Sequence, residues 1–243
     1  MQLGISRDAA REYFAGRTVL EYGPGDVPGV ALMMLANGAR KVFLADRFPL
    51  IGDSDKNVAA VRELLHRMSP EERERALECL RVPAELRSGY RDDRLEYLVR
   101  DSGLSGLRAE ADLVVSRAVL EHVDDLDATF ADMERALKPG GVALHLVDLK
   151  SHGLHTRNPL DFLTWPEPLW RSMYSAKGVP NRWRVDRYRE ILSNGGLRIE
   201  RLEPTVLAGE RDVAEVRPRL AAPFRNLSDE DLSWLGFWLV CRK

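Results

Sequence analysis

Residues 18–46 restrict the possible folds more than any other part of the chain. The apolar run that begins at Thr18 has the pattern of a buried strand and ends at a turn containing Gly23 and Gly25. Pro28 then opens an apolar helix that stops at an Asn-Gly pair, and the stretch KVFLAD that follows is a second buried strand. A loop–helix–strand crossover this short implies that the two strands are parallel.

The alternation of strands and helices continues to the end of the chain. Further strands are expected at 95–101, 111–116, 142–148, 197–204 and 237–243. The helix before the strand at 142–148 carries apolar residues along one face, at Leu126, Phe130, Met133 and Leu137. The stretch LKPGG at 137–141 is expected to end this helix, and the last strand, which no obvious crossover helix precedes, is expected to be antiparallel.

These elements predict an α/β fold with a doubly wound, seven-stranded, mostly parallel sheet, an antiparallel last strand and helices on both faces. Ligands of such sheets bind beyond the carboxyl ends of the strands. The length suits a single domain over residues 1–243. Two stretches interrupt the alternation: a charged helical insertion at 47–94, and a segment at 149–183 rich in proline and aromatic residues, which we expect to be a substrate lid.

Composition excludes several classes of protein. The formal net charge is −2, so no overall field attracts nucleic acid or an anionic membrane, and neither partner is expected. The two cysteines form no CxxC pair, and the N-terminal stretch lacks the apolar core of a signal peptide. No apolar run is long enough to cross a membrane. A cytoplasmic location is therefore expected.

The glycine turn admits two interpretations. In a dinucleotide-binding G-x-G-x-x-G turn, Gly23 and Gly25 would be the first two glycines, but Pro28 stands at the third position and Glu21 would face phosphate. If the ligand instead carries a positive charge here, Glu21 is favourable. Asp46, at the end of the second strand, can then accept hydrogen bonds from both hydroxyls of a ribose.

The second interpretation resembles motif I of class I S-adenosylmethionine-dependent methyltransferases, E/D-x-G-x-G-x-G, with Val27 in place of the third glycine. The stretch DLVVSRAVLEHV at 112–123 resembles the fourth strand and following loop of that family. LKPGG resembles its turn before the fifth strand, and the last two strands resemble its closing pair. The resemblance in motifs covers about residues 17–150. It implies S-adenosylmethionine as cofactor and S-adenosylhomocysteine as product.

The resemblance also implies roles for the first cofactor-binding residues. Glu21 would stabilise the positively charged end of the cofactor, near its ammonium group or through water. Gly23 and Gly25 would pack against its methionine portion and its ribose. Asp46, followed by Arg47, would accept hydrogen bonds from the ribose hydroxyls.

The remaining cofactor-binding residues follow later strands. The resemblance implies that Asp101, with Ser102 beside it, binds the adenine amino group. Ser116 and Arg117 would line the sulfonium end through their backbone groups. Solvated strand-end acids and a surface ion pair of Arg117 remain alternatives.

Catalysis of methyl transfer depends mainly on alignment and exclusion of water, and an oxygen nucleophile also needs a base. Candidate bases at the strand ends are His122, Asp148, His152 and His155. Asp148, His152 and His155 are also residue types that bind metal ions, but metal-dependent O-methyltransferases use an all-oxygen set, so no metal is expected. His145 lies inside a strand and is expected to be a core histidine.

The expected activity is methyl transfer to a small-molecule or glycan acceptor by in-line displacement. The basic stretch 171–190 would attract an anionic substrate or form a solvated helix face. The alternatives are an NAD(P)-dependent oxidoreductase and a cofactor-binding protein without turnover. The acceptor, its reactive atom and the oligomeric state do not follow from the sequence.

Overall fold

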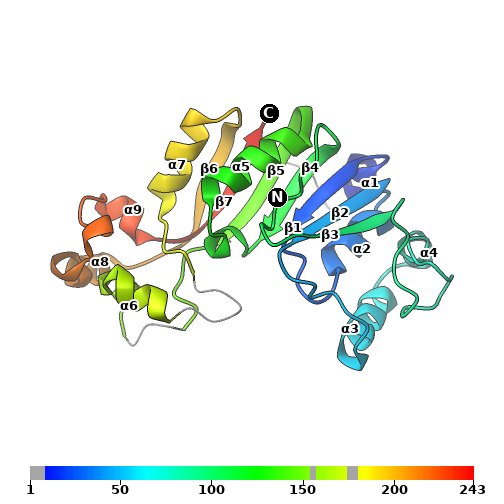
Figure 1. Cartoon of the computed structure of the whole chain (residues 1–243), viewed down its shortest axis with the longest axis horizontal. Helices are drawn as coiled ribbons and strands as arrows, with labels where there is room; N and C mark the ends of the chain where they lie inside the picture. Colours follow the sequence, from blue (N-terminus) through cyan, green and yellow to red (C-terminus); the bar gives the residue numbers. More distant parts are fainter. Residues whose placement is uncertain (1–8, 154–156, 174–179) are drawn as a thin grey trace. The chain divides into compact units, whose positions relative to one another are not determined.

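The computed structural model of the chain describes residues 9–153, 157–173 and 180–243 (Figure 1). Its strands are β1 (Thr18–Tyr22), β2 (Lys41–Asp46), β3 (Leu95–Val99), β4 (Ala111–Arg117), β5 (Leu137–Asp148), β6 (Arg198–Leu207) and β7 (Trp234–Arg242). Its α-helices are α1 (Ala10–Phe14), α2 (Gly29–Ala36), α3 (Asp55–His66), α4 (Pro70–Leu77), α5 (Leu126–Ala136), α6 (Glu167–Ser172), α7 (Val185–Asn194), α8 (Glu210–Val216) and α9 (Asp229–Ser233). Short 3-10 helices are η1 (Leu120–His122), η2 (Asp161–Thr164), η3 (Arg217–Arg219) and η4 (Ala222–Phe224).

The strands form one seven-stranded sheet in the order β3-β2-β1-β4-β5-β7-β6, which confirms the predicted fold class. β1 pairs in parallel with β2 and with β4, and β2 pairs in parallel with β3. β7 is antiparallel to β5: Lys243 at the chain end bonds to Gly140 and Gly141 near the start of β5, whereas Leu149 just after β5 donates to Leu235 near the start of β7. Of the helices in the described ranges, none is long and apolar enough to cross a membrane.

The chain divides into two compact units. Unit 1 comprises the described residues up to Ser116 together with 131–144 and 242–243, and unit 2 comprises 117–130 and 145–241. Both α5 and β5 therefore begin in one unit and end in the other. The prediction of a single domain with insertions at 47–94 and 149–183 stays a prediction.

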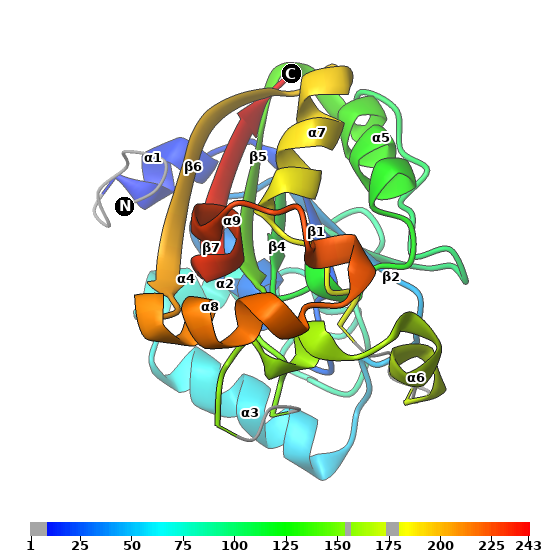
Figure 2. The same cartoon turned by 90° about the vertical axis from the view of Figure 1, so that its left-hand side faces the viewer.

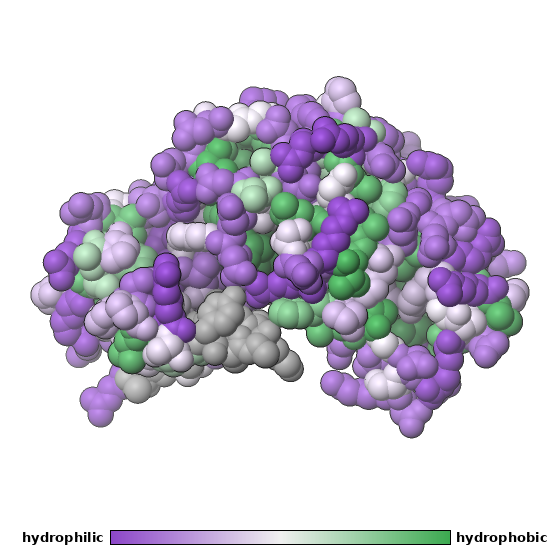
Figure 3. Space-filling model, viewed as in Figure 1, coloured by the Kyte–Doolittle hydropathy of each residue, from purple (hydrophilic) through white to green (hydrophobic). Residues whose placement is uncertain are grey.

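In unit 1, the strands β1 and β2 are apolar and almost fully buried, and α2 contributes Ala31 and Leu35 to the same core. The predicted insertion at 47–94 contains the helices α3 and α4. Ser69 caps α4 in a capping box: the Glu72 N–H donates to Ser69 Oγ (3.3 Å) and the Ser69 N–H donates to Glu72 Oε2 (2.8 Å). Figure 3 shows hydrophilic residues gathered over α3 and α4, as expected for helices with one solvated face.

In unit 2, α7 lies over the strands at the end of the sheet (Figure 2). The ring of Tyr188 on α7 packs edge-on against Phe237 of β7, with ring centroids 5.0 Å apart. A second buried cluster joins the predicted lid segment to the connection between β6 and β7. Its members are Leu160, Phe162, Leu163, Trp170, Ala208, Val213, Val216, Leu220, Phe224, Leu232 and Leu235.

The helix ends directly before LKPGG, as expected, but the turn expected there and the place of Leu137 on the helix face were wrong. α5 ends at Ala136, and residues 137–141 form the first part of β5 instead of a turn after the helix. Backbone hydrogen bonds explain the difference, because the Gly140 N–H donates to Lys243 O (3.1 Å) and the Lys243 N–H donates to Gly141 O (3.0 Å). Pairing with the last residue of the chain extends the strand, a long-range contact that local residue preferences do not reveal.

Candidate active site

The glycine turn follows directly from the end of β1. The Gly23 N–H donates to Ala45 O (2.9 Å), which continues the pairing of β1 with β2. Gly23 and Gly25 have φ angles of 62° and 74°, in the left-handed region that favours glycine. A Cβ at Gly25 would meet no atom within 4 Å, so backbone conformation rather than space within the protein requires glycine there.

Glu21 is a buried carboxylate in β1, just before this turn. Its side chain is 7% exposed, and Oε2 has no hydrogen-bond partner among the described residues. Burial raises the pKa of Glu21 to about 7, although the backbone N–H of Ala31 in the first turn of α2 partly offsets the rise. A cationic group at this place would favour the ionised carboxylate; the role expected of Glu21 towards the cofactor stays a prediction.

Asp46 and the Asp101–Ser102 turn lie side by side at one end of unit 1's strands. Asp46 ends β2, where its Oδ1 accepts from the Phe48 N–H (3.0 Å) and its carbonyl accepts from the Arg100 N–H (3.0 Å). A Cβ at Gly103 would lie 3.7 Å from Cβ of Arg47, so the turn after β3 packs against Arg47. The structure thus brings together four predicted residues: Asp46, Arg47, Asp101 and Ser102.

Ser116 and Arg117 end β4. Ser116 is 5% exposed and lies in register with Tyr22, so it is next to the glycine turn in the sheet. Arg117 is exposed and belongs to unit 2. The backbone roles expected of both residues stay predictions.

Asp132 is a buried acid that sequence reasoning missed, and it holds segments beside the candidate cofactor-binding residues of unit 1. Asp132 on α5 is 1% exposed and accepts from the Tyr22 hydroxyl (2.5 Å), the Ser105 N–H (2.6 Å), the Ser105 hydroxyl (2.7 Å) and the Gly106 N–H (3.0 Å). It therefore ties the end of β1 to the loop that follows Asp101. The only signal in the sequence is a short acid beside the apolar stripe of a helix.

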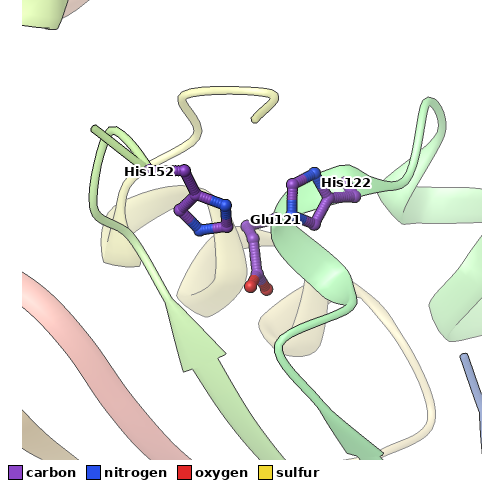
Figure 4. Close-up of side chains that lie close together, drawn as sticks. All are labelled: Glu121, His122 and His152. Carbon is purple, nitrogen blue, oxygen red and sulfur yellow. The ribbon is translucent and has the colours of Figure 1, made fainter. Parts of the chain in front are cut away.

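The candidate catalytic histidines of unit 2 lie at the ends of β4 and β5. His122 is in η1 and His152 follows β5, with their ring centroids 4.8 Å apart (Figure 4). The third candidate, His155, lies outside the described residues. His145 is fully buried against Phe130, and burial lowers its pKa to about 3, as expected of a core histidine.

Glu121, which was not among the candidate residues from the sequence, completes this cluster. One ligand atom each of Glu121, His122 and His152 lies within 4.8 Å of the other two. Glu121 is 1% exposed, and neither of its carboxylate oxygens has a hydrogen-bond partner in the described ranges. Burial and the nearby carboxylate of Asp148 raise its pKa to about 8, against the partial effect of the backbone N–H groups of Glu121 and Asp148.

The arginines of the basic stretch 171–190 are engaged within unit 2. Arg184 is 1% exposed and donates to three backbone carbonyls, those of Leu149, Leu232 and Trp234. Arg182 is 3% exposed and donates to Phe162 O, Trp165 O and Glu167. Arg171, Arg187 and Arg189 form ion pairs with Glu167, with Asp127 and Glu190, and with Asp231. Two of these arginines are thus core residues and not a solvated helix face.

Residues 4–202 match the family model described as "Methyltransferase domain". No curated protein is similar enough in sequence to count as a relative.

Several solved structures share the fold. A methyltransferase from Methanosarcina mazei is 14% identical, with a TM-score of 0.55 and 96% of this chain and 95% of that chain covered. A methyltransferase from Mesorhizobium loti is 18% identical, with a TM-score of 0.53 and 97% and 96% covered. The phosphoethanolamine N-methyltransferase 2 of Haemonchus contortus, in complex with S-adenosyl-L-methionine, is 18% identical, with a TM-score of 0.52; the match covers 96% of this chain and 50% of that one.

Proposed function

The chain belongs to the methyltransferase-domain family of S-adenosylmethionine-dependent enzymes, and on that premise we propose that it methylates a small-molecule or glycan acceptor by in-line displacement. The observation that carries the proposal is the buried, unpartnered Oε2 of Glu21 directly before the two left-handed glycines. A phosphate would be repelled at this point, whereas an ammonium group would compensate the carboxylate.

The residues of unit 1 fit the cofactor. When bound, S-adenosylmethionine supplies a methyl group on a positively charged sulfur, whose departure leaves a neutral thioether. Glu21 would hold the ammonium end, the turn at Gly23 and Gly25 would pass close to the methionine portion, and Asp46 would accept from the ribose hydroxyls. The turn at Asp101 and Ser102 packs beside Asp46 and Arg47, which supports its assignment to the adenine.

The acceptor-side residues are assigned to unit 2. The cluster of Glu121, His122 and His152 is the group of titratable side chains available to manage the proton that a hydroxyl or amine acceptor loses as its bond to carbon forms. The segment 157–172 shares a core with the connection between β6 and β7, which supports its role as a cover over the substrate. The similarity to a phosphoethanolamine N-methyltransferase supports a small acceptor.

A reducing, cytoplasmic location is part of the same proposal. Cys79 and Cys241 are buried free thiols, a state that a reducing compartment maintains. The arginines described in the basic stretch are bonded to groups of the protein itself, so they do not support an anionic acceptor.

Isothermal titration tests the cofactor assignment. We expect one S-adenosylmethionine and one S-adenosylhomocysteine to bind per chain, and Asp46→Ala to weaken both by at least about tenfold, the effect of losing one good hydrogen-bonded contact. Asp53→Ala, which removes an exposed acid, is the matched control and should bind as the wild type does. Binding of NAD in place of both sulfur compounds would contradict the assignment.

Turnover is tested separately. Incubation of the enzyme with isotopically labelled cofactor and a metabolite extract should transfer label to a small molecule. Cofactor binding without any labelled product, in extracts that cover the metabolites of the source cell, would favour a binding protein without turnover.

A further inference from the structure

Glu121 is a buried acid that the protein compensates only in part, through backbone N–H groups of Glu121 and Asp148 that do not reach hydrogen-bond geometry. Its side chain is 1% exposed, and both carboxylate oxygens lack a hydrogen-bond partner among the described residues. Buried carboxylates are ordinarily paired with a cation or with several donors, because an isolated buried charge is costly. The unpartnered oxygens therefore indicate a missing partner.

The neighbouring charges favour a cation as that partner. The carboxylate of Asp148 acts on Glu121 with the same sign, so the surroundings of Glu121 are more negative than burial alone would make them. Two buried cations of unit 2 are engaged elsewhere: Arg184 donates to the backbone carbonyls of Leu149, Leu232 and Trp234, and Arg182 pairs with Glu167.

Two imidazoles accompany this carboxylate. Ligand atoms of Glu121, His122 and His152 lie within 4.8 Å of one another, and Figure 4 shows both rings beside Glu121, on segments that follow different strands. Tetrahedral coordination with bonds of about 2.1 Å places ligand atoms about 3.4 Å apart, so small side-chain rotations would close the set around an ion. His152 is exposed, which leaves the cluster accessible from solvent.

The backbone carrying two of the three groups is held firmly. The Asn181 N–H donates to Glu121 O (2.7 Å), and its side-chain amide donates to Leu120 O (2.9 Å) and Val123 O (3.1 Å). η1 is thus fixed at both ends by one side chain. Such support lowers the entropy lost when side chains converge on a ligand.

We propose that Glu121, His122 and His152 form a binding site for one divalent transition-metal ion of the zinc type. Two imidazoles and one carboxylate are a donor set that suits zinc, and three protein ligands leave a coordination position open. The set differs from the Asp148, His152 and His155 combination considered from the sequence. It includes the residue that burial singles out and leaves out His155, which lies outside the described residues.

The open position links the site to the acceptor, and this step alone rests on the proposed function. A hydroxyl acceptor held there by the ion would release its proton to water at a lower pH than in solution, which favours attack through oxygen. Metal binding itself does not depend on the identity of the reaction.

The test is zinc binding to the full chain after removal of metals with a chelator. Titration in competition with a chromophoric chelator should give one zinc per chain for the wild type. Glu121→Gln and His152→Ala should each weaken binding at least tenfold. His66→Ala, which removes an exposed histidine at the end of α3, should leave it unchanged. Circular dichroism of each variant verifies that it is folded.

A second measurement identifies the ligands directly. Cobalt bound at the site should give the visible absorption of a low-coordinate nitrogen and oxygen environment, and this absorption should be lost in His152→Ala. A wild type that binds no zinc, or variants that bind zinc as the wild type does, would overturn the proposal. The zinc titrations are done without S-adenosylmethionine, so they are independent of the cofactor titration. A protein that binds zinc but not the cofactor would refute only the proposed function. A protein that binds the cofactor but not zinc would refute only the metal site.

Discussion

The charge state of Glu21 decides what the glycine turn can bind. The turn itself is compatible with several nucleotide ligands, since glycines at left-handed φ occur in many of them. The buried carboxylate of Glu21 beside the turn is more selective, because its Oε2 has no partner among the described residues and a cation or donor of the ligand would satisfy it. At the scale of single residues, the acid is more informative than the glycines.

The affinity for S-adenosylmethionine should therefore depend on pH. The pKa of Glu21 is about 7 in the free protein, and an ammonium group favours the ionised form. Below pH 7 the cofactor must displace a proton, so its dissociation constant should rise by up to tenfold for each pH unit lost. Isothermal titration at pH 5.5, 6.5 and 7.5, values that bracket this pKa, measures the slope.

Glu21→Gln is the matched control for this slope. The amide keeps the shape but does not titrate, so binding should be weak and nearly independent of pH between 5.5 and 7.5, on either side of the wild-type pKa. If the variant showed the same slope as the wild type, another group would be responsible and the role of Glu21 would be refuted.

Stability should change with pH in the opposite direction. The pKa of Glu21 rises from 4.5 to about 7 on folding, so between these values the folded state binds more protons than the unfolded state. The free energy of unfolding should thus be fully supported below about pH 4.5 and fall as pH rises to about 7, by about 3 kcal/mol from this residue. Urea unfolding of the wild type and of Glu21→Gln at pH 5 and pH 8 measures this contribution as the change with pH in the difference between their unfolding free energies. A difference that is the same at both pH values contradicts the expectation.

At the scale of elements, α5 connects parts of unit 1 that are distant in sequence. Asp132 and Tyr22 are 110 positions apart, and Asp132 and Ser105 are 27 apart. Through Asp132 the helix holds the end of β1, just before the glycine turn, and the loop after β3, just after Asp101 and Ser102.

Asp132→Ala should consequently destabilise the protein by about 3 kcal/mol or more, because it leaves several buried donors without an acceptor. Urea unfolding at pH 7 measures the loss. Asp127→Ala on the same helix removes only an exposed ion pair with Arg187 and should cost less than about 1 kcal/mol. Equal effects of the two substitutions would show that the buried hydrogen bonds of Asp132 contribute little.

The contrast between local and long-range contacts explains which features could be predicted from the sequence. The glycine turn and the strands with their order along the chain depend on neighbouring residues, and the prediction was confirmed for each. Asp132, Glu121 and Arg184 could not be identified, because their importance comes from burial and from partners far away in the chain. The prediction of a turn at LKPGG was wrong for the same reason, because hydrogen bonds to Lys243, far away in the chain, extend β5 through this stretch.

At the scale of the whole molecule, neither unit is continuous in the sequence. Unit 1 includes residues 131–144 and 242–243, which follow the first segment of unit 2, and unit 2 includes 117–130, which lies between two segments of unit 1. One helix and one strand, α5 and β5, each supply residues to both units. Folding of either unit therefore orders segments that the other also needs, which should make unfolding cooperative.

The tryptophans make this cooperativity measurable, because Trp165, Trp170, Trp183, Trp234 and Trp238 all belong to unit 2. Leu113→Ala opens a cavity in unit 1, where Leu113 is 1% exposed, and should cost about 2–5 kcal/mol. If unfolding is cooperative, the substitution lowers the urea midpoint of tryptophan fluorescence as much as that of circular dichroism. Leu50→Ala, at a position 45% exposed in the same unit, should shift neither by much. A fluorescence midpoint that stays at the wild-type value while the circular dichroism becomes biphasic would show instead that the two units unfold independently.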